Sequence, residues 1–319
     1  MTEAAILGCG AYLPERIVTN VDLEKIVDTN DEWITSRTGI KQRHIARDDE
    51  LSSDMAAKAA KIAISSAGID ANDIGLIVVA TTTADKIFPS TAVHVQEKLS
   101  ITNGCGAFDV QAVCAGFIYA VSIAESFIKS GQADNVLVIG VDKMSSIVDW
   151  QDRGTCVLFG DGAGAVVIGK SKDEESRILS SSLYSAGEFK DILYTDGGVG
   201  SKSHGVVKMV GQEVFKHATS KMSKAIKDIL KKNGLSVEDI NYLIPHQANR
   251  RIMDMVAKKL KISESNVIST VHNHANTSAA SIPLALFDGV SAGKIKKGDV
   301  IAFTAIGGGL TWGAVLLKW

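Results

Sequence analysis

The sequence predicts an α/β protein built from two similar halves, and three observations support this prediction. Short runs rich in Val, Ile and Leu alternate with segments of helical periodicity along the whole chain. The apolar fraction is 45 % and the charged fraction is 22 %, which is typical of a globular protein with a substantial core. Segments of the first half also recur in the second half, in the same order.

Six segments have the composition of buried strands. Their near-continuous Val, Ile and Leu content favours sheets that are covered by helices on both faces. The longest apolar runs are far shorter than the roughly 20 residues of a membrane-spanning helix, so no membrane segment is expected. The expected strands are 4–10, 76–82, 135–141, 165–169, 242–246 and 300–306.

An internal repeat suggests that the two halves arose by duplication. The segment 65–80 resembles 231–246, and 130–140 resembles 292–305, in both cases at a spacing of about 165 residues. The alternative is that any two helix–turn–strand units look alike. Two matches in the same order at similar spacing favour duplication.

Two polar, irregular segments interrupt the alternation of strands and helices. The charged stretch 169–177 is the best boundary, which gives halves 1–172 and 173–319. The Gly-rich segment 186–211 is expected to be an irregular loop that covers a site, because loops of this length are usually functional or flexible.

Charge and cysteine usage narrow the class of protein. The formal net charge of −2 gives no reason to expect nucleic-acid binding. The N-terminus lacks the basic region of a secretory signal, and the four cysteines lack C-x-x-C spacing, so a reduced cytoplasmic protein is expected. His272 and His274 form an H-x-H pair without an indicated third ligand, so no metal is expected.

Cys114 is the candidate nucleophile. It begins an apolar helical segment, directly after the strand-like run 107–113. The partial positive charge of a helix N-terminus is expected to lower the pKa of a thiol there. The alternative is an inert buried cysteine, which is the interpretation for Cys9, Cys105 and Cys156 because none clearly begins a buried helix.

His246 and Asn276 complete a candidate set. His246 ends an expected strand, where the alternative role is that of an ordinary hydrogen-bonded histidine. The residues Gln247, Asn249 and Arg250 beside it are too polar for a core turn. Asn276 precedes a helix of small residues, where its alternative role is to cap that helix. Cys, His and Asn far apart in sequence form a nucleophile set that papain-like hydrolases also use. The glycines 307–309 form either a tight turn or a backbone donor for an oxyanion.

Five motifs together closely resemble the β-ketoacyl-acyl-carrier-protein synthase III family, the initiating condensing enzymes of bacterial type II fatty acid synthesis. The resemblance covers essentially the whole chain. It implies a thiolase-like fold, in which two duplicated α/β halves form five α-β-α-β-α layers, and a homodimer. The motifs are DVQAVCAGF at 109–117, FGDGAGA at 159–165, IPHQANRRI at 244–252, HANTSAASIP at 274–283 and GGGLTWG at 307–313.

The resemblance also implies an acyltransferase. It would condense an acyl-coenzyme A primer, with acetyl as the expected acyl group, with malonyl-acyl carrier protein. Cys114 would carry the acyl group, and the N–H groups of Cys114 and Gly309 would form the oxyanion hole. His246, as a neutral donor, and Asn276 would stabilise the charge that develops when malonyl loses carbon dioxide. Coenzyme A thioester is then a substrate, and no cofactor is expected.

Further contacts follow from the same resemblance. Coenzyme A would contact Thr29, Trp33, Arg37, Arg153, Gly211, Phe215, Ala248 and Asn249, with Trp33 and Arg153 on either side of the adenine. The acyl pocket would include Leu310 and, from the second subunit, Phe88. The acidic carrier protein would contact Arg251, Lys216, Lys258 and Lys259, although the lysines also fit a solvated helix face.

Two residues depart from the family pattern. Ala275 stands where the family often has Gly, and Leu310 stands where some members have Phe. The length and branching of the primer therefore stay open. One alternative is a thiolase-fold relative that joins other acyl groups in a polyketide- or quinolone-type pathway. A non-catalytic binder of coenzyme A or carrier protein is a second alternative, against which the intact Cys, His and Asn argue.

Overall fold

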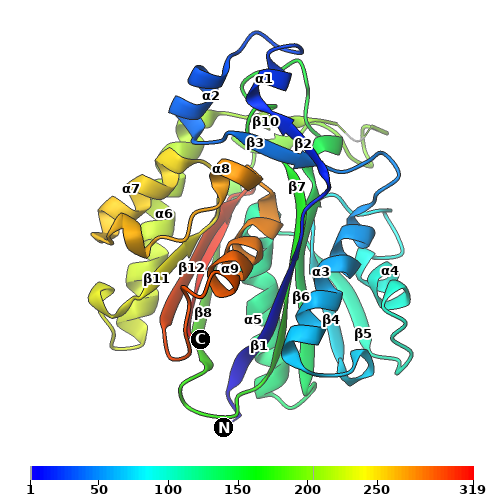
Figure 1. The fold of residues 1–319 in the computed structure, drawn as a ribbon, viewed down its shortest axis with the longest axis vertical. Helices are drawn as coiled ribbons and strands as arrows, with labels where there is room; N and C mark the ends of the chain where they lie inside the picture. Colours follow the sequence, from blue (N-terminus) through cyan, green and yellow to red (C-terminus); the bar gives the residue numbers. More distant parts are fainter. Residues whose placement is uncertain (1, 204) are drawn as a thin grey trace.

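Two β-sheets, each covered by helices on both faces, form the frame of the molecule (Figure 1). The structure is a computed structural model that describes residues 2–203 and 205–319. Within these residues, no helix is both long and apolar enough to cross a membrane.

The first sheet has the strand order β1-β7-β6-β4-β5. Strand β4 pairs in parallel with β5 and β6, whereas β7 runs antiparallel to β1 and β6. Nearly every side chain of β4, β6 and β7 is buried, as their continuous apolar composition predicts. The strands are β1 (Ala4–Tyr12), β4 (Leu76–Ala80), β5 (Gly106–Val110), β6 (Asn135–Lys143) and β7 (Asp161–Lys170).

The second sheet has the order β11-β12-β13-β8. Strand β11 is parallel to β12, and the other two pairings are antiparallel. Strands β8 and β13 were not among the expected strands, and the Ser-rich run of β8 lacks a continuous apolar pattern. Strand β5 lies mostly within the strand-like run 107–113. The strands are β8 (Arg177–Ser185), β11 (Tyr242–Pro245), β12 (Val300–Gly307) and β13 (Thr311–Lys318).

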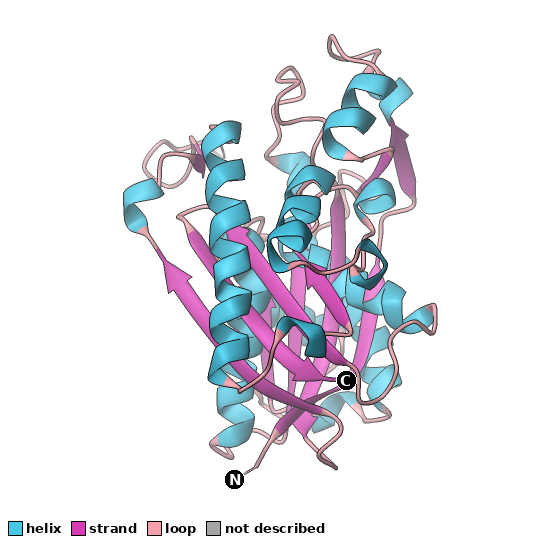
Figure 2. Ribbon diagram, turned by 90° about the vertical axis from the view of Figure 1, so that its left-hand side faces the viewer, coloured by secondary structure: helices cyan, strands magenta, loops and turns pink. Residues whose placement is uncertain are grey.

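Helices complete five layers, α-β-α-β-α, which lie side by side in Figure 1. Figure 2 looks onto the outer helices that cover the second sheet. Two helices pack on the outer face of the first sheet, two on that of the second, and two lie between the sheets. These pairs are α3 (Ser52–Ala67) with α4 (Thr91–Lys98), α6 (Gly211–Lys232) with α7 (Arg250–Leu260), and α5 (Gly116–Lys129) with α9 (Ser281–Ser291). The thiolase-like layer arrangement is therefore confirmed.

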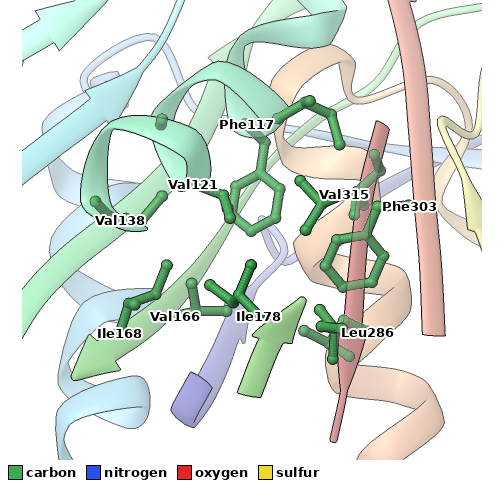
Figure 3. Packing of buried hydrophobic residues seen from close by; sticks show 14 of the residues in the cluster. Phe117, Val121, Val138, Val166, Ile168, Ile178, Leu286, Phe303 and Val315 are labelled. Carbon is green, nitrogen blue, oxygen red and sulfur yellow. The ribbon is translucent and has the colours of Figure 1, made fainter. Parts of the chain in front are cut away.

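Small residues let the helices approach the sheets closely. Gly10 in β1 faces α3 at a point where an added Cβ would lie 2.2 Å from the carbonyl oxygen of Ala59. The buried face of α3 is mostly alanine, which keeps that approach short. Between the sheets, larger side chains from both halves interlock, with Phe117 of α5 and Phe303 of β12 at a centroid distance of 6.4 Å (Figure 3). The two halves thus share one central core.

The repeat is visible in the backbone. Gly68 and Gly234 each lie just after a helix. Both glycines have φ near +65°, a conformation that glycine adopts without strain. Each is followed by a 3₁₀ turn with a capping box and then by a buried strand, β4 or β11. The predicted boundary between 1–172 and 173–319 falls in the turn between β7 and β8, and independent domain status for each half stays a prediction.

The remaining elements cluster at the end of the molecule where α1, α2 and α8 lie (Figure 1). The segment 186–211 is less irregular than expected, because Leu193–Thr195 and Val207–Met209 pair as an antiparallel ribbon. The elements are β2 (Arg16–Thr19), α1 (Asn20–Leu23), α2 (Asp31–Thr38), β3 (Gln42–Ile45), β9 (Leu193–Thr195), β10 (Val207–Met209) and α8 (Val271–His274).

Candidate active site

Cys114, His246 and Asn276 line one cavity of about 650 Å³. They come from both halves of the chain, and each side chain is less than 10 % exposed. The same cavity extends to Trp33 and Arg37 on α2. The structure therefore brings together, in one cavity, the three residues that the sequence singled out.

A strained turn places Cys114 at the start of α5. Val113 has φ +49°, a conformation that β-branched residues rarely adopt. A 3₁₀ turn, Val113–Ala115, then leads into the α-helix, which begins at Gly116 rather than at the cysteine. An added Cβ on Gly307 would lie 2.7 Å from the Cys114 nitrogen, so only glycine lets β12 pack against this turn.

The expected lowering of the Cys114 pKa is wrong for the free protein. Burial raises the pKa of the thiol to about 12, and the nearby Asp142 carboxylate adds to this rise. Burial also raises the pKa of Cys9 to about 12 and that of Cys156 to about 11. What distinguishes Cys114 from these two is its position on the cavity wall. Its raised pKa means that the thiol is protonated at neutral pH.

His246 directly follows β11 and is 2 % exposed. Its backbone N–H donates to the carbonyl oxygen of Thr304 at 2.8 Å, which continues the pairing of β11 with β12. Burial lowers the pKa of the imidazole to about 3. The ring is therefore neutral at physiological pH, as the resemblance implied.

Asn276 is held by its backbone on both sides. Its N–H donates to Leu158 O at 2.9 Å, and its carbonyl accepts from the Gly160 N–H at 3.0 Å. The side-chain Oδ1 accepts from the Ser278 N–H at 2.9 Å, but this is a local turn contact, because the N-caps of the following 3₁₀ turn and of α9 are Thr277 and Ala280. Within the described residues the Nδ2 amino group donates to no protein acceptor, which leaves it free to donate to a ligand.

The backbone at Ala275 shows why glycine is favoured at this position. Its backbone has φ +57° and ψ −160°, a region that is essentially restricted to glycine. A glycine at this position adopts that conformation without the steric cost that Ala275 carries.

A buried carboxylate that sequence analysis missed lies beneath the site. Asp142, at the end of β6, is fully buried and accepts from the backbone N–H groups of Thr82 at 2.7 Å and Ala279 at 3.1 Å. It thereby joins the end of β4 to the loop that carries Asn276. An Asp within the otherwise apolar run of β6 was the available signal, because a buried charge requires dedicated partners.

The outer part of the cavity is cationic and aromatic. The guanidinium carbons of Arg37 and Arg153 lie 4.9 and 5.3 Å from the ring centroid of Trp33. Of the expected coenzyme A contacts, six line the cavity: Trp33, Arg37, Gly211, Phe215, Ala248 and Asn249. Thr29 and Arg153 do not line it, although Arg153 Nη1 donates to the carbonyl oxygen of Asp28 at 3.0 Å, beside Thr29.

The two expected acyl-pocket residues differ in position. Leu310 and Gly309 line the cavity, as do apolar residues that sequence analysis did not assign, such as Met144 and Ile147. Phe88 is 82 % exposed and does not line the cavity of its own chain. The roles of both residues stay predictions.

The expected carrier-protein contacts are exposed. Arg251 is on the rim of the cavity, at the start of α7, and no carboxylate among the described residues pairs with it. Lys216, Lys258 and Lys259 lie outside the cavity lining. Asn249 also caps α7, since its Oδ1 accepts from the Arg251 N–H at 2.8 Å.

The described residues contain no group of three His, Cys, Asp or Glu side chains arranged to hold a metal ion. Instead, His274 Nε2 lies 3.5 Å from Asp288 Oδ2, and the His274 ring is edge-on to the ring of His44. The expectation that the protein uses neither metal nor cofactor stays a prediction.

Comparisons with known proteins agree with this geometry. Family models for 3-oxoacyl-[acyl-carrier-protein (ACP)] synthase III match residues 108–187 and, for its C-terminal part, 230–319. A β-ketoacyl-[acyl-carrier-protein] synthase III from Ehrlichia canis is 56 % identical over 319 residues and covers 100 % of both chains.

Solved structures show the same relationship. The 3-oxoacyl-[acyl-carrier-protein] synthase III of Aquifex aeolicus superposes with a TM-score of 0.95 and 51 % identity, covering 99 % of this chain and 100 % of that one. The priming β-ketosynthase of the R1128 polyketide pathway superposes with a TM-score of 0.93 and 34 % identity, covering 98 % and 96 %. With this agreement over its full length, the chain belongs to the β-ketoacyl-acyl-carrier-protein synthase III family.

Proposed function

We propose that the protein starts fatty acid synthesis by condensing an acyl-coenzyme A primer with malonyl-acyl carrier protein. The observation that supports this most directly is the single cavity that joins Cys114, His246 and Asn276 to the aromatic and cationic mouth at Trp33 and Arg37. This arrangement would put a nucleophile, two hydrogen-bond donors and a site for a phosphate-bearing thioester in one continuous space.

In the first step, the Cys114 sulfur attacks the thioester carbonyl of the primer. The bond between acyl carbon and coenzyme A sulfur breaks, and coenzyme A leaves as a thiol with the proton that Cys114 gives up. The N–H groups of Cys114 and Gly309 are proposed to stabilise the oxyanion. The close packing of Gly307 against the Cys114 turn fixes the direction of the Cys114 N–H.

In the second step, malonyl-acyl carrier protein binds and loses carbon dioxide. The electron pair of the broken C–C bond moves onto the thioester, where charge develops on the carbonyl oxygen. The neutral imidazole of His246 and the free Nδ2 of Asn276 donate to that oxygen. The carbanion equivalent then attacks the acyl carbonyl, a C–C bond forms, and the bond to the Cys114 sulfur breaks. The released thiolate takes up one proton from solvent to restore the thiol.

Coenzyme A is proposed to bind at the mouth of the cavity, and no resident cofactor takes part. Trp33 would stack on the adenine, with Arg153 on its other side, and Arg37 would contact phosphate. The present distances of both guanidinium groups from the Trp33 ring show that these three side chains already lie together. Thr29, Gly211, Phe215, Ala248 and Asn249 would complete the contacts.

A homodimer in the cytoplasm is the proposed state. Ile87 and Phe88 are adjacent and more than 80 % exposed, which is costly for a free monomer and typical of an interface. In a dimer, Phe88 would close the acyl pocket of the partner subunit. Sedimentation of the wild type at micromolar concentration tests this state.

One observation supports a second candidate function, priming of a polyketide pathway. The R1128 priming β-ketosynthase has the same fold and is 34 % identical. The higher identities to synthases III, 51 % and 56 %, favour fatty acid synthesis.

Incubation with a panel of acyl-coenzyme A species distinguishes the two candidate functions. We expect intact-protein mass spectrometry to show one acyl group per chain, on Cys114, with acetyl transferred fastest. Acylated protein should then convert malonyl-acyl carrier protein to the 3-ketoacyl product. Preferential transfer of longer or branched groups would favour the polyketide candidate, and no transfer to Cys114 would contradict both.

Arg251→Glu is expected to raise the KM for malonyl-acyl carrier protein about tenfold or more. The residue is exposed at the rim, on the helix that begins beside His246, and charges at a rim mainly steer the encounter with an oppositely charged partner. Acylation of Cys114 by acyl-coenzyme A should change less than about threefold. Steady-state kinetics with each substrate varied separately measures both.

Lys172→Glu is the matched control, because it makes the same charge change on an exposed turn between β7 and β8, outside the cavity lining. The KM of the wild type should also rise with salt, since a Debye length of about 8 Å screens rim charges. An equal loss of both half-reactions in Arg251→Glu would place this residue in the coenzyme A site instead.

A further inference from the structure

Ser281 makes a direct contact with the imidazole of His246. The Nδ1 atom of the ring and the Ser281 Oγ lie 2.7 Å apart, and both residues are 2 % exposed. Ser281 is the first residue of α9, between the two sheets, whereas His246 follows β11. The contact therefore joins the central helix layer to the second sheet, away from solvent.

A second hydrogen bond decides the direction of the first. The backbone N–H of Gln247 donates to the Ser281 Oγ at 3.3 Å. The Gln247 side chain is itself fixed, since its Nε2 donates to Pro245 O at 2.7 Å and its Oε1 accepts from the Thr270 N–H at 2.9 Å. The backbone that presents the Gln247 N–H is thus held in place.

The hydroxyl has one proton and two lone pairs. The Gln247 N–H occupies one lone pair, and the only acceptor that the described residues offer to the proton is His246 Nδ1. If Nδ1 carried a hydrogen instead, the Ser281 proton would be buried without a partner, which is unfavourable. The hydroxyl therefore donates and Nδ1 accepts, and in a neutral ring the hydrogen is then on Nε2.

We propose that Ser281 is a positioning residue that holds His246 in the tautomer with hydrogen on Nε2, so that the ring can donate to the thioester carbonyl of the extender. This inference rests on the proposed function for the use of that donor. The tautomer itself follows from the two hydrogen bonds of the Ser281 hydroxyl. Burial, which lowers the pKa of the ring, keeps it in the neutral form for which the tautomer matters.

The tautomer can be measured without any activity. In protein labelled with ¹⁵N-histidine, the two ring nitrogens of a neutral imidazole have distinct chemical shifts, and His246→Gln identifies the signals of His246. We expect an unprotonated Nδ1 and a protonated Nε2 in the wild type at pH 7. Ser281→Ala should give a mixture of tautomers, and Ser281→Thr, which keeps a hydroxyl, should restore the wild-type pattern.

The kinetic test separates positioning from folding. Ser281→Ala should lower kcat for malonyl decarboxylation by about twofold to tenfold with little change in KM, in proportion to the fraction of the ring that loses the Nε2 hydrogen and cannot donate. Acylation of Cys114 should change less than about twofold. Ser223→Ala is the matched control, since Ser223 is also buried but donates within α6, to Thr219 O at 2.8 Å.

Each result bears on a different claim. A wild-type signal with hydrogen on Nδ1 overturns the proposal, even if Ser281→Ala does not fold. Unchanged tautomer and decarboxylation in a folded Ser281→Ala protein also overturn it. If the tautomer is as expected but His246→Ala decarboxylates normally, the proposed role of His246 in decarboxylation is wrong. The inference that Ser281 fixes the tautomer of His246 is then still supported.

Discussion

Cys114→Ala is expected to lower the rate of condensation at least a thousandfold while malonyl decarboxylation continues. The substitution removes the sulfur that carries the acyl group, so the covalent step has no replacement. Decarboxylation depends on His246 and Asn276, whose backbone and side-chain contacts do not involve Cys114. Release of carbon dioxide from malonyl-acyl carrier protein, measured beside formation of the 3-ketoacyl product, separates the two reactions.

Cys156→Ala is the matched control for this experiment. Cys156 is fully buried and, like Cys114, has a pKa that burial raises, but it does not line the cavity. Condensation by that variant should stay within about threefold of the wild type. Condensation that survives Cys114→Ala would show that Cys114 is not the acyl carrier proposed here. Loss of decarboxylation together with condensation would contradict the separate roles given to Cys114 and to the pair His246 and Asn276.

Periodicity and motifs predicted the frame of the molecule well. The strands of continuous apolar composition, β4, β6 and β12, lie where the sequence indicates, because burial on both faces leaves an unmistakable pattern. The recurring glycines Gly68 and Gly234 mark equivalent helix ends in the two halves. The Ser-rich β8 was missed, since its strand identity comes from pairing with β13 rather than from its own composition.

The electrostatics of the site could not be predicted in the same way. A helix N-terminus suggested a lowered thiol pKa, yet Cys114 is enclosed by residues far apart in sequence, and burial outweighs the effect of the helix. Asp142 and Ser281 were missed for a related reason. Each acts through contacts with residues more than 30 positions away, and a sequence pattern carries no information about such distances.

His246→Ala is expected to have the opposite effect to Cys114→Ala. Decarboxylation should fall by about 10²–10³-fold, which is the usual cost of removing one pre-positioned donor from a developing oxyanion. Acylation of Cys114 should change less than about threefold, because the contacts assigned to coenzyme A lie at the mouth of the cavity. Single-turnover acylation followed by mass spectrometry, with decarboxylation measured separately, gives both values.

His246→Gln offers a graded comparison, since its side-chain amide can still donate and should recover part of the lost decarboxylation. His94→Ala, on α4 outside the cavity lining, is the control. If His246→Ala blocked acylation and spared decarboxylation, the division of roles between the two halves of the site would be reversed.

The pH dependence gives an independent test of the same donor. Burial lowers the pKa of His246 from its ordinary 6.5 to about 3, so the ring stays neutral as the pH falls from 8 to 5. Decarboxylation by Cys114→Ala should therefore show no inflection near pH 6.5, whereas a solvent-exposed histidine would gain its proton there and change the rate. An inflection at that pH, absent from His246→Gln, would show that the imidazole is accessible to water and titrates, which is incompatible with a buried, permanently neutral donor.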